Sequence, residues 1–152
     1  MTMRVCRWIF LGLTCYLGFS ALTYGQAHKD GWKLFAGVEF VRTYFEAEDT
    51  YFLAPKFDAR MLSLQGQTVQ LRGYVMPFDF GDEPTIVLSK FPFSQCFFCG
   101  AAGPESVAQI FFDKKPREFV PDEVITVSGK LQLNATDVEK LNFQLVQARI
   151  VP

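Results

Sequence analysis

Histidine and cysteine are scarce in this sequence. Of its 152 residues, one is His and four are Cys, so a Ser–His–Asp triad or a closed four-ligand zinc site has few residues from which to form. There is no glycine-rich loop of the kind that cradles phosphates. The apolar run near the N-terminus spans about 15 residues, fewer than the roughly 20 that a membrane-spanning helix needs. These absences argue against nucleotide hydrolysis, triad hydrolysis and a membrane-spanning protein.

The first 27 residues have the layout of a secretory signal. Arg4 and Arg7 precede the apolar run, and small residues at Gly25 and Ala27 follow it. A positive start, an apolar segment and a small-x-small site in this order are typical of a cleavable export signal. We therefore predict a signal peptide over residues 1–27, cut after Gly25 or Ala27, and an exported, periplasmic protein. An uncleaved anchor is the alternative.

Removal of this segment changes the cysteine count and the charge. Cys6 and Cys15 leave with it, so the mature chain keeps only Cys96 and Cys99. The full chain has 15 basic and 16 acidic side chains. Two arginines are lost with the signal, which leaves 13 against 16 and a formal net charge of −3. A mildly acidic domain has no field that attracts phosphate backbones or anionic lipid, so we expect neither nucleic acid as a partner nor direct membrane insertion of the mature chain.

Residues 28–54 predict an N-terminal β-hairpin extension. After a polar start at 28–31, which we expect to be frayed, residues 38–45 are rich in β-forming side chains. A charged turn at 46–49 follows, and the β pattern resumes at 50–53. Two such runs around a short polar turn indicate a hairpin.

Residues 55–152 predict a small barrel domain. Gly73 and Gly129 fall at inward positions in the middle of alternating segments, where glycine marks the bends of a curled barrel. About 85 residues with five bent strands fit a five-stranded OB-like barrel, with an open sandwich as the alternative. The fold class is therefore mainly β, with one or two short helices. The five β segments are 69–76, 85–91, 106–112, 124–133 and 142–151.

Finer features follow from the pattern within these segments. Asp58 can cap a short helix that runs to Leu64 and that Gly66 ends in the left-handed conformation. Residues 137–141 are long enough for one further helical turn. A change of phase within 142–151, after which Ile150 is expected to face inward, predicts a β-bulge. In the first barrel segment, Val69, Leu71, Gly73 and Val75 are expected to face inward, and Gln70, Arg72, Tyr74 and Met76 outward.

The stretch with the most distinctive chemistry is the turn around Cys96-Phe97-Phe98-Cys99, which Gly100 follows. Cys-x-x-Cys spacing lets two sulfurs converge on one metal ion or close on each other. Phe97 and Phe98 lie between cysteines in a turn, so at least one of them is expected to be exposed and to contact another protein.

Three short motifs of the chain resemble those of a known family. Gly73-Tyr74-Val75-Met76-Pro77, the cysteine-centred turn and Val127-Ser-Gly129-Lys-Leu131 together resemble an exported bacterial family of unknown function. Its members are small OB-like barrels, and several are encoded near ABC-type permeases linked with transition metals. Much of that family has Cys-x-His where this chain has Cys96-x-x-Cys99. Because thiolate and imidazole both bind borderline or soft metals, the interchange favours a metal site. The resemblance implies no established activity.

Four interpretations of the cysteine pair stay open. A local disulfide or two buried thiols could simply brace the turn, since an oxidising compartment favours pairing. A metal could bind, with zinc or copper as the candidates and Glu105 as a possible third ligand. Thiol–disulfide exchange is less favoured, because the usual strand–helix context is absent. Haem attachment is excluded, because Gly100 stands where His is required.

We therefore expect an exported binding module, more a carrier than an enzyme, that binds or relays a transition metal through Cys96 and Cys99. It would serve as an accessory to a membrane transport or assembly system. A non-catalytic interaction module with a structural cysteine pair and a thiol–disulfide oxidoreductase are the alternatives.

Overall fold

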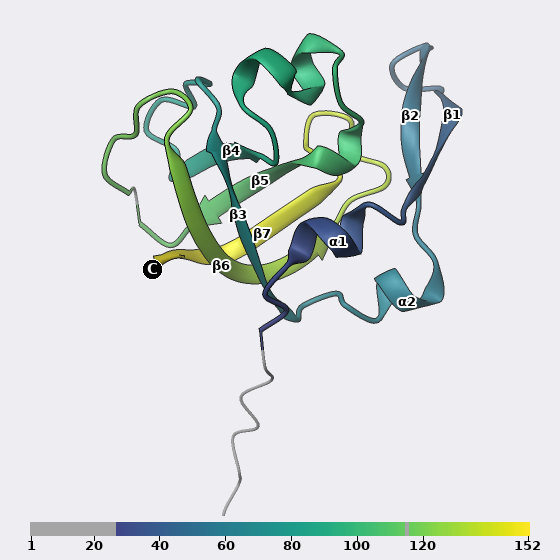
Figure 1. Cartoon of the computed structure of the whole chain (residues 1–152). Coiled ribbons are helices and arrows are strands. Elements are labelled where there is room, and N and C mark those ends of the chain that lie inside the picture. Colours follow the sequence, from purple (N-terminus) through teal and green to yellow (C-terminus); the bar gives the residue numbers. More distant parts are fainter. Residues whose placement is uncertain (1–26, 115) are drawn as a thin grey trace, which may run out of the picture.

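The computed structural model describes residues 27–114 and 116–152 and is mainly β, as predicted. A closed five-stranded barrel forms its body, a two-stranded hairpin stands to one side, and the helices are short (Figure 1). Residues 1–26 of the proposed signal peptide lie outside the described residues. The hairpin is β1 (Glu39–Phe45) with β2 (Thr50–Lys56), and the barrel strands are β3 (Thr68–Val75), β4 (Thr85–Ser89), β5 (Val107–Phe112), β6 (Val124–Leu133) and β7 (Phe143–Val151).

The barrel closes in the order β3-β4-β5-β7-β6, with β6 returning to β3. The β5–β7 pair is parallel, and the other four pairs are antiparallel. This is the five-stranded, OB-like closure that the sequence predicts. Closure leaves none of the five strands with an open edge, so the free strand edges of the described chain belong to the hairpin.

Alternation along the chain explains which faces of β3 and β6 are buried. Val69, Leu71 and Val75 are buried in the barrel, and Ile125 and Val127 meet them from β6. Period-two patterning of this kind places one set of side chains inside and the other outside. These predicted inward positions are confirmed.

Two glycines allow the strands to bend tightly. A Cβ on Gly73 would lie 2.3 Å from the carbonyl oxygen of Ser89, and one on Gly129 would lie 3.0 Å from the Cβ of Leu145. Opposite Gly129, the pairing of β6 with β7 shifts register, and Gln147 has a positive φ of 51°. An extra residue on one strand with this backbone conformation is a β-bulge, so the predicted bulge is confirmed. Beyond it, however, Ile150 is exposed rather than inward.

The segment before the hairpin is ordered, contrary to the frayed start that the sequence predicted. The backbone of His28 pairs with β3, donating to Thr68 O at 3.0 Å and accepting from Gln70 N at 2.8 Å. A short helix that the sequence did not predict, α1 (Gly31–Phe35), follows. It buries Trp32 and Phe35 in the barrel core. Burial of these two rings, rather than any capping side chain on Asp30, holds α1 in place.

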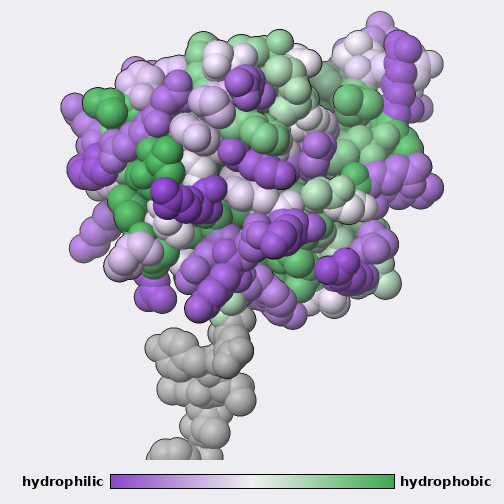
Figure 2. All heavy atoms as spheres, viewed as in Figure 1, coloured by the Kyte–Doolittle hydropathy of each residue, from purple (hydrophilic) through white to green (hydrophobic). Residues whose placement is uncertain are grey.

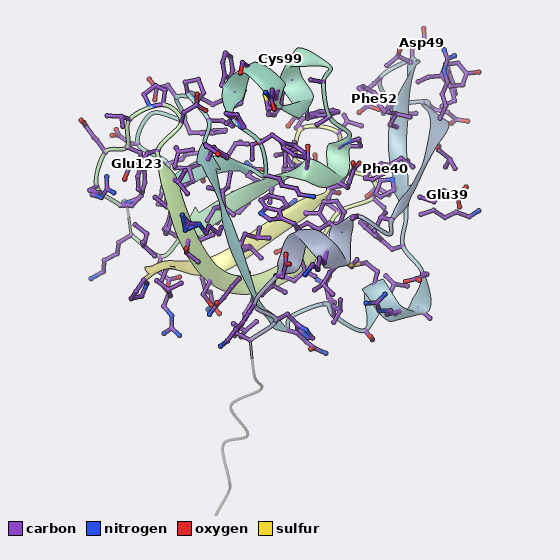
Figure 3. The ribbon with its side chains drawn as sticks, in the orientation of Figure 1. Glu39, Phe40, Asp49, Phe52, Cys99 and Glu123 are labelled. Carbon is purple, nitrogen blue, oxygen red and sulfur yellow. The ribbon has the colours of Figure 1, made fainter. Side chains whose placement is uncertain are left out.

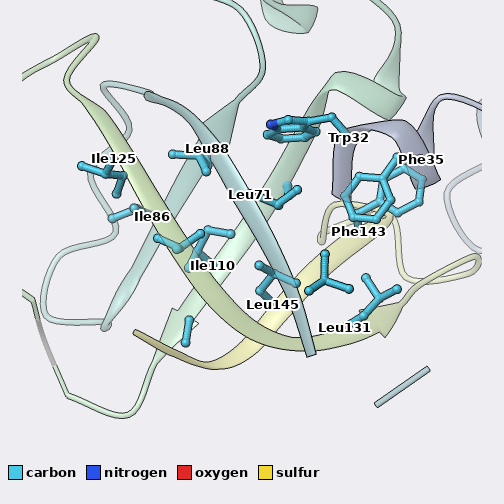
Figure 4. Close-up of a cluster of buried hydrophobic side chains, with 14 of the residues drawn as sticks. Trp32, Phe35, Leu71, Ile86, Leu88, Ile110, Ile125, Leu131, Phe143 and Leu145 are labelled. Atoms are coloured by element: carbon cyan, nitrogen blue, oxygen red, sulfur yellow. The ribbon is translucent and has the colours of Figure 1, made fainter. Parts of the chain in front are cut away.

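Phe143 joins the barrel to the hairpin and the helices. Its ring stacks on Phe35 with centroids 4.0 Å apart (Figure 4) and meets Phe40 and Phe57 edge-on. Phe40 belongs to β1, so the base of the hairpin packs on the same core. Aromatic pairs in these geometries add to the free energy of burial.

The predicted short helix is present as α2 (Ala59–Leu62). Asp58 caps it, accepting from Met61 N at 2.7 Å, and Gly66 has a φ of 75°. In contrast, residues 137–141 form a hydrogen-bonded turn and not a helix, and β4 ends at Ser89, two residues before the predicted limit. None of the helices in the described ranges is long and apolar enough to cross a bilayer.

Gly73→Ala is expected to destabilise the protein by about 1–3 kcal/mol, the usual range for overpacking. The cause is that the new Cβ would collide with the Ser89 carbonyl, which is backbone and cannot turn aside. Gly37→Ala is the control, because a Cβ there has no neighbour within 4 Å. Urea unfolding monitored by circular dichroism measures both; equal midpoints for the two variants would contradict the account of β3.

Candidate functional site

The cysteine turn, residues 91–106, connects β4 to β5. It consists of three short 3-10 helices, η1 (Phe93–Gln95), η2 (Phe97–Cys99) and η3 (Pro104–Ser106). η1 and η2 lie at the top of the barrel in Figure 1, η3 lies lower, directly before β5, and Figure 3 places Cys99 at the top, on the opposite side of the molecule from α2. The amide of Phe93 donates to the Asp122 carboxylate at 2.7 Å, which ties the start of the turn to the neighbouring loop.

The turn folds over the outer face of β4 and β5 and forms a second core there. Met76, Val87, Cys96 and Val107 are its buried members, and Phe97 packs against them from the partly exposed side. This packing explains why every residue of β4 is buried. It also explains why Met76 is buried although the strand pattern predicted an outward position.

The two cysteines occupy opposite environments. Cys96 is fully buried in the second core, whereas Cys99 is exposed, and the structure has both as free thiols. The Cys99 thiol donates to the carbonyl oxygen of Phe93 at 3.1 Å. The single 3-10 turn between the cysteines keeps Cys99 beside the anchored Cys96.

The pKa of the Cys99 thiol is raised above its ordinary value. Desolvation by the surrounding turn is the largest cause, followed by a hydrogen bond with the Cys96 side chain and by charge repulsion from Cys96. Each of these favours the protonated form, so Cys99 is a thiol at neutral pH and becomes a thiolate only at higher pH.

Phe93, Phe97 and Phe98 belong to the cysteine turn, and Phe78 packs against Phe98; we call these four phenylalanines the aromatic rim. The Phe98 ring lies 4.7 Å from Phe78 and 5.4 Å from Phe97, both in edge-on geometry. Phe98 is 43% exposed, Phe93 40% and Phe78 39%. Phe97 is half-buried, so of the two residues between the cysteines it is Phe98 that faces solvent.

Glu105 and His28 do not join the cysteines. The Glu105 carboxylate folds back over Gly103, where a Cβ would lie 2.2 Å from its Oε2 atom. His28 lies beside β3, and its Nε2 is 3.1 Å from the Gln67 side-chain oxygen. Within the described ranges no three His, Cys, Asp or Glu side chains are grouped closely enough to hold a metal ion. The described site therefore offers two sulfurs and no third ligand.

This arrangement disfavours disulfide exchange. Reactive pairs need an accessible thiolate of lowered pKa. Here the first cysteine is buried and the accessible second one has a raised pKa. Two sulfurs side by side remain suited to binding a soft cation or to forming a local disulfide with each other.

Sequence reasoning missed Phe78, Phe93 and the second core. The mostly apolar composition of β4 and β5 is the signal that could have revealed the second core, because strands without a regular alternation of apolar and polar residues are typically covered on both faces. Nothing in the sequence links Phe78 to Phe98, since their contact depends on how two loops fold over the barrel end.

Comparisons of the chain with protein-family models, with curated proteins and with solved structures found no match. The resemblance to an exported OB-like family rests on the short motifs alone.

Cys96→Ser is expected to destabilise the protein by about 1–3 kcal/mol, because it places a hydroxyl among apolar side chains. Cys99→Ser changes an exposed residue and is expected to stay within about 0.5 kcal/mol of the parent. Urea unfolding under reducing conditions measures the difference. Similar losses for the two variants would contradict the unequal environments.

Alkylation should modify Cys99 and leave Cys96 protected in the folded protein. Because the pKa of Cys99 is raised, the thiolate fraction is small at pH 7, and the rate should still be rising above pH 9. Peptide mass spectrometry after iodoacetamide treatment at several pH values gives this profile. A rate that is half-maximal at or below about pH 8.5, the ordinary pKa of cysteine, would show that the pKa of the thiol is not raised.

Proposed function

We propose that this protein is an exported binding module that carries a thiophilic metal ion on Cys96 and Cys99, monovalent copper in preference to zinc. The observation that supports it is the pair of adjacent free thiols at an exposed barrel end, with no third ligand among the described residues. Soft thiolate ligands select Cu(I), and two of them suffice for its low coordination number.

Zinc fits the site less well. A tetrahedral Zn²⁺ ion needs four ligands, so two coordination positions would be left to water. The neighbouring aromatic rim supplies rings and no donor atoms for such water molecules.

The unequal burial of the sulfurs suits exchange of the ion. Cys96 is closed to solvent, so loading requires η2 to move outward until both sulfurs face the ion. Cys99 stays accessible and can be the first sulfur to release the ion to a thiol on another protein. The aromatic rim beside it supplies a contact surface, and a membrane transport or assembly protein is the proposed partner.

Anaerobic titration of the reduced protein with Cu(I) against a coloured chelator tests this function. We expect one equivalent to bind, and Cys99→Ser to weaken binding by more than about a hundredfold, since loss of a ligand should exceed the 10–100-fold effect of outer-shell partners. Glu105→Gln is the matched control and should bind normally, because Glu105 lies against Gly103. Absence of copper uptake, or unchanged uptake by Cys99→Ser, would remove the proposal.

The pH dependence of copper binding adds a second readout. Metal binding must displace protons from both thiols, and the pKa of Cys99 is raised. The apparent affinity should therefore increase with pH throughout the neutral range and level off only above the raised pKa of Cys99. An affinity that is independent of pH between 6 and 8 would mean that the thiols are not the ligands.

A non-catalytic interaction module is the second candidate, and the burial of Cys96 in the second core favours it. In that case the cysteines brace the turn and the aromatic rim alone contacts the partner. Replacing both cysteines by Ser would then lower stability without changing partner binding, whereas Phe98→Ala would weaken partner binding.

A further inference from the structure

Charge is segregated between the barrel wall and the rest of the protein. Strands β3 to β7 contain Arg72, Lys130 and Arg149 and no acidic residue. All 16 Asp and Glu residues of the chain lie outside these strands. The net charge of the domain predicted no attraction to anions, but this sum does not show that the charged side chains of the barrel strands are all basic. Hydrophilic side chains gather on the face seen in Figure 2, over the region where β3 and β6 cross in Figure 1.

A hollow of about 460 Å³ lies on this wall beside β3. Lys29 and Asp30 precede α1, and Lys90 directly follows β4. The polar side chains that line the hollow are those of Lys29, Asp30, Gln70, Arg72, Tyr74 and Lys90. The lining thus contains three cations, a phenol, an amide and a single carboxylate.

The only carboxylate of the hollow is already engaged. Asp30 lies 3.0 Å from the ammonium of Lys33. Within the described part of the chain, no carboxylate comes within ion-pair distance of Lys29, Arg72 or Lys90. The Lys90 ammonium lies over the Phe91 ring, 5.3 Å from its centroid. Three cations therefore share a hollow without a neutralising partner.

The floor of the hollow is rigid. The Trp32 indole donates to the carbonyl oxygen of Arg72 at 2.8 Å, and Gly73 lies in tight contact with the Ser89 backbone. The backbone of His28 pairs with β3 directly before Lys29. Arg72 and Lys29 are thus attached to a fixed surface, which lowers the entropy lost when they bind a ligand.

We propose that this hollow binds a phosphate group. A guanidinium offers a planar pair of donors that matches phosphate oxygens, and two ammonium groups supply the remaining charge for a dianion. The Tyr74 hydroxyl and the Gln70 amide add neutral donors. The phosphate can belong to a soluble phosphate ester or to the headgroup of an anionic phospholipid, since both present the same oxygens. This site is separate from the cysteine pair and does not depend on metal binding.

Titration of the ¹⁵N-labelled protein with inorganic phosphate and with glycerol 1-phosphate tests the site by NMR. We expect saturable shifts of the amides around Lys29, Arg72 and Lys90. Arg72→Gln should weaken binding about tenfold or more, the effect of losing one hydrogen bond to a charged group. The Arg72 side chain is exposed and makes no contact on which the fold depends. The backbone carbonyl of residue 72, which accepts a hydrogen bond from Trp32, is retained in the variant. Lys90→Gln is the second variant and should weaken binding similarly.

Lys56→Gln is the matched control, because it removes one positive charge from the hairpin, away from the hollow. It should leave phosphate binding unchanged. Equal weakening by Lys56→Gln and Arg72→Gln would show attraction to overall charge only and would overturn the site, as would the absence of saturable shifts with every probe.

Flotation with vesicles distinguishes the two sources of phosphate. Binding to phosphatidylglycerol vesicles but not to phosphatidylcholine vesicles, lost in Arg72→Gln and kept in Lys56→Gln, identifies a lipid headgroup. Saturable binding of the soluble esters without vesicle binding identifies a free phosphate ester. Binding of neither ligand contradicts the proposal, whatever the copper titration shows.

Discussion

Burial of the Cys96 thiol against Met76, Val87 and Val107 is the contact on which the cysteine turn depends. Three 3-10 helices of three residues each cannot hold their own shape in water, because so few hydrogen bonds do not offset the loss of chain entropy. Complete burial of an apolar side chain is worth roughly 1.5–3 kcal/mol. The second core can therefore order the turn, and Cys99, one short turn further along the chain, is held at the surface as a result.

The same packing changes what this barrel can recognise. OB-folds bind oligonucleotides and oligosaccharides on the outer face of their second and third strands, which correspond to β4 and β5 here. In this protein that face is filled by the cysteine turn, and Val87 and Val107 contact Cys96 rather than solvent. The contact surfaces proposed here are therefore the aromatic rim at the end of the barrel and the basic hollow beside β3.

The barrel could be predicted because the sequence signals for its strands are local and periodic. Val69, Leu71 and Val75 repeat every second residue, and glycine at position 73 interrupts them where the strand must bend. The helix α1 could not be predicted, because its five residues have no capping side chain and therefore carry no helical signal. Only burial of Trp32 and Phe35 orders them. The site was predictable only in part. Spacing identified Cys96 and Cys99 as neighbours, but the orientation of Glu105 and the contact of Phe78 with Phe98 depend on how loops cross the barrel end.

The contrast between the two thiols bears on metal binding and on redox chemistry in different ways. A nucleophile must exist as a thiolate before it meets its substrate, so a raised pKa lowers its rate directly. The incoming ion displaces the proton of a metal ligand, and the proton passes to water, so the same raised pKa lowers affinity by an amount that a higher pH can restore. Burial of Cys96 likewise slows attack by a bulky disulfide far more than entry of a single ion. The features that make this pair a poor redox centre are therefore compatible with a slow, selective carrier of a soft cation.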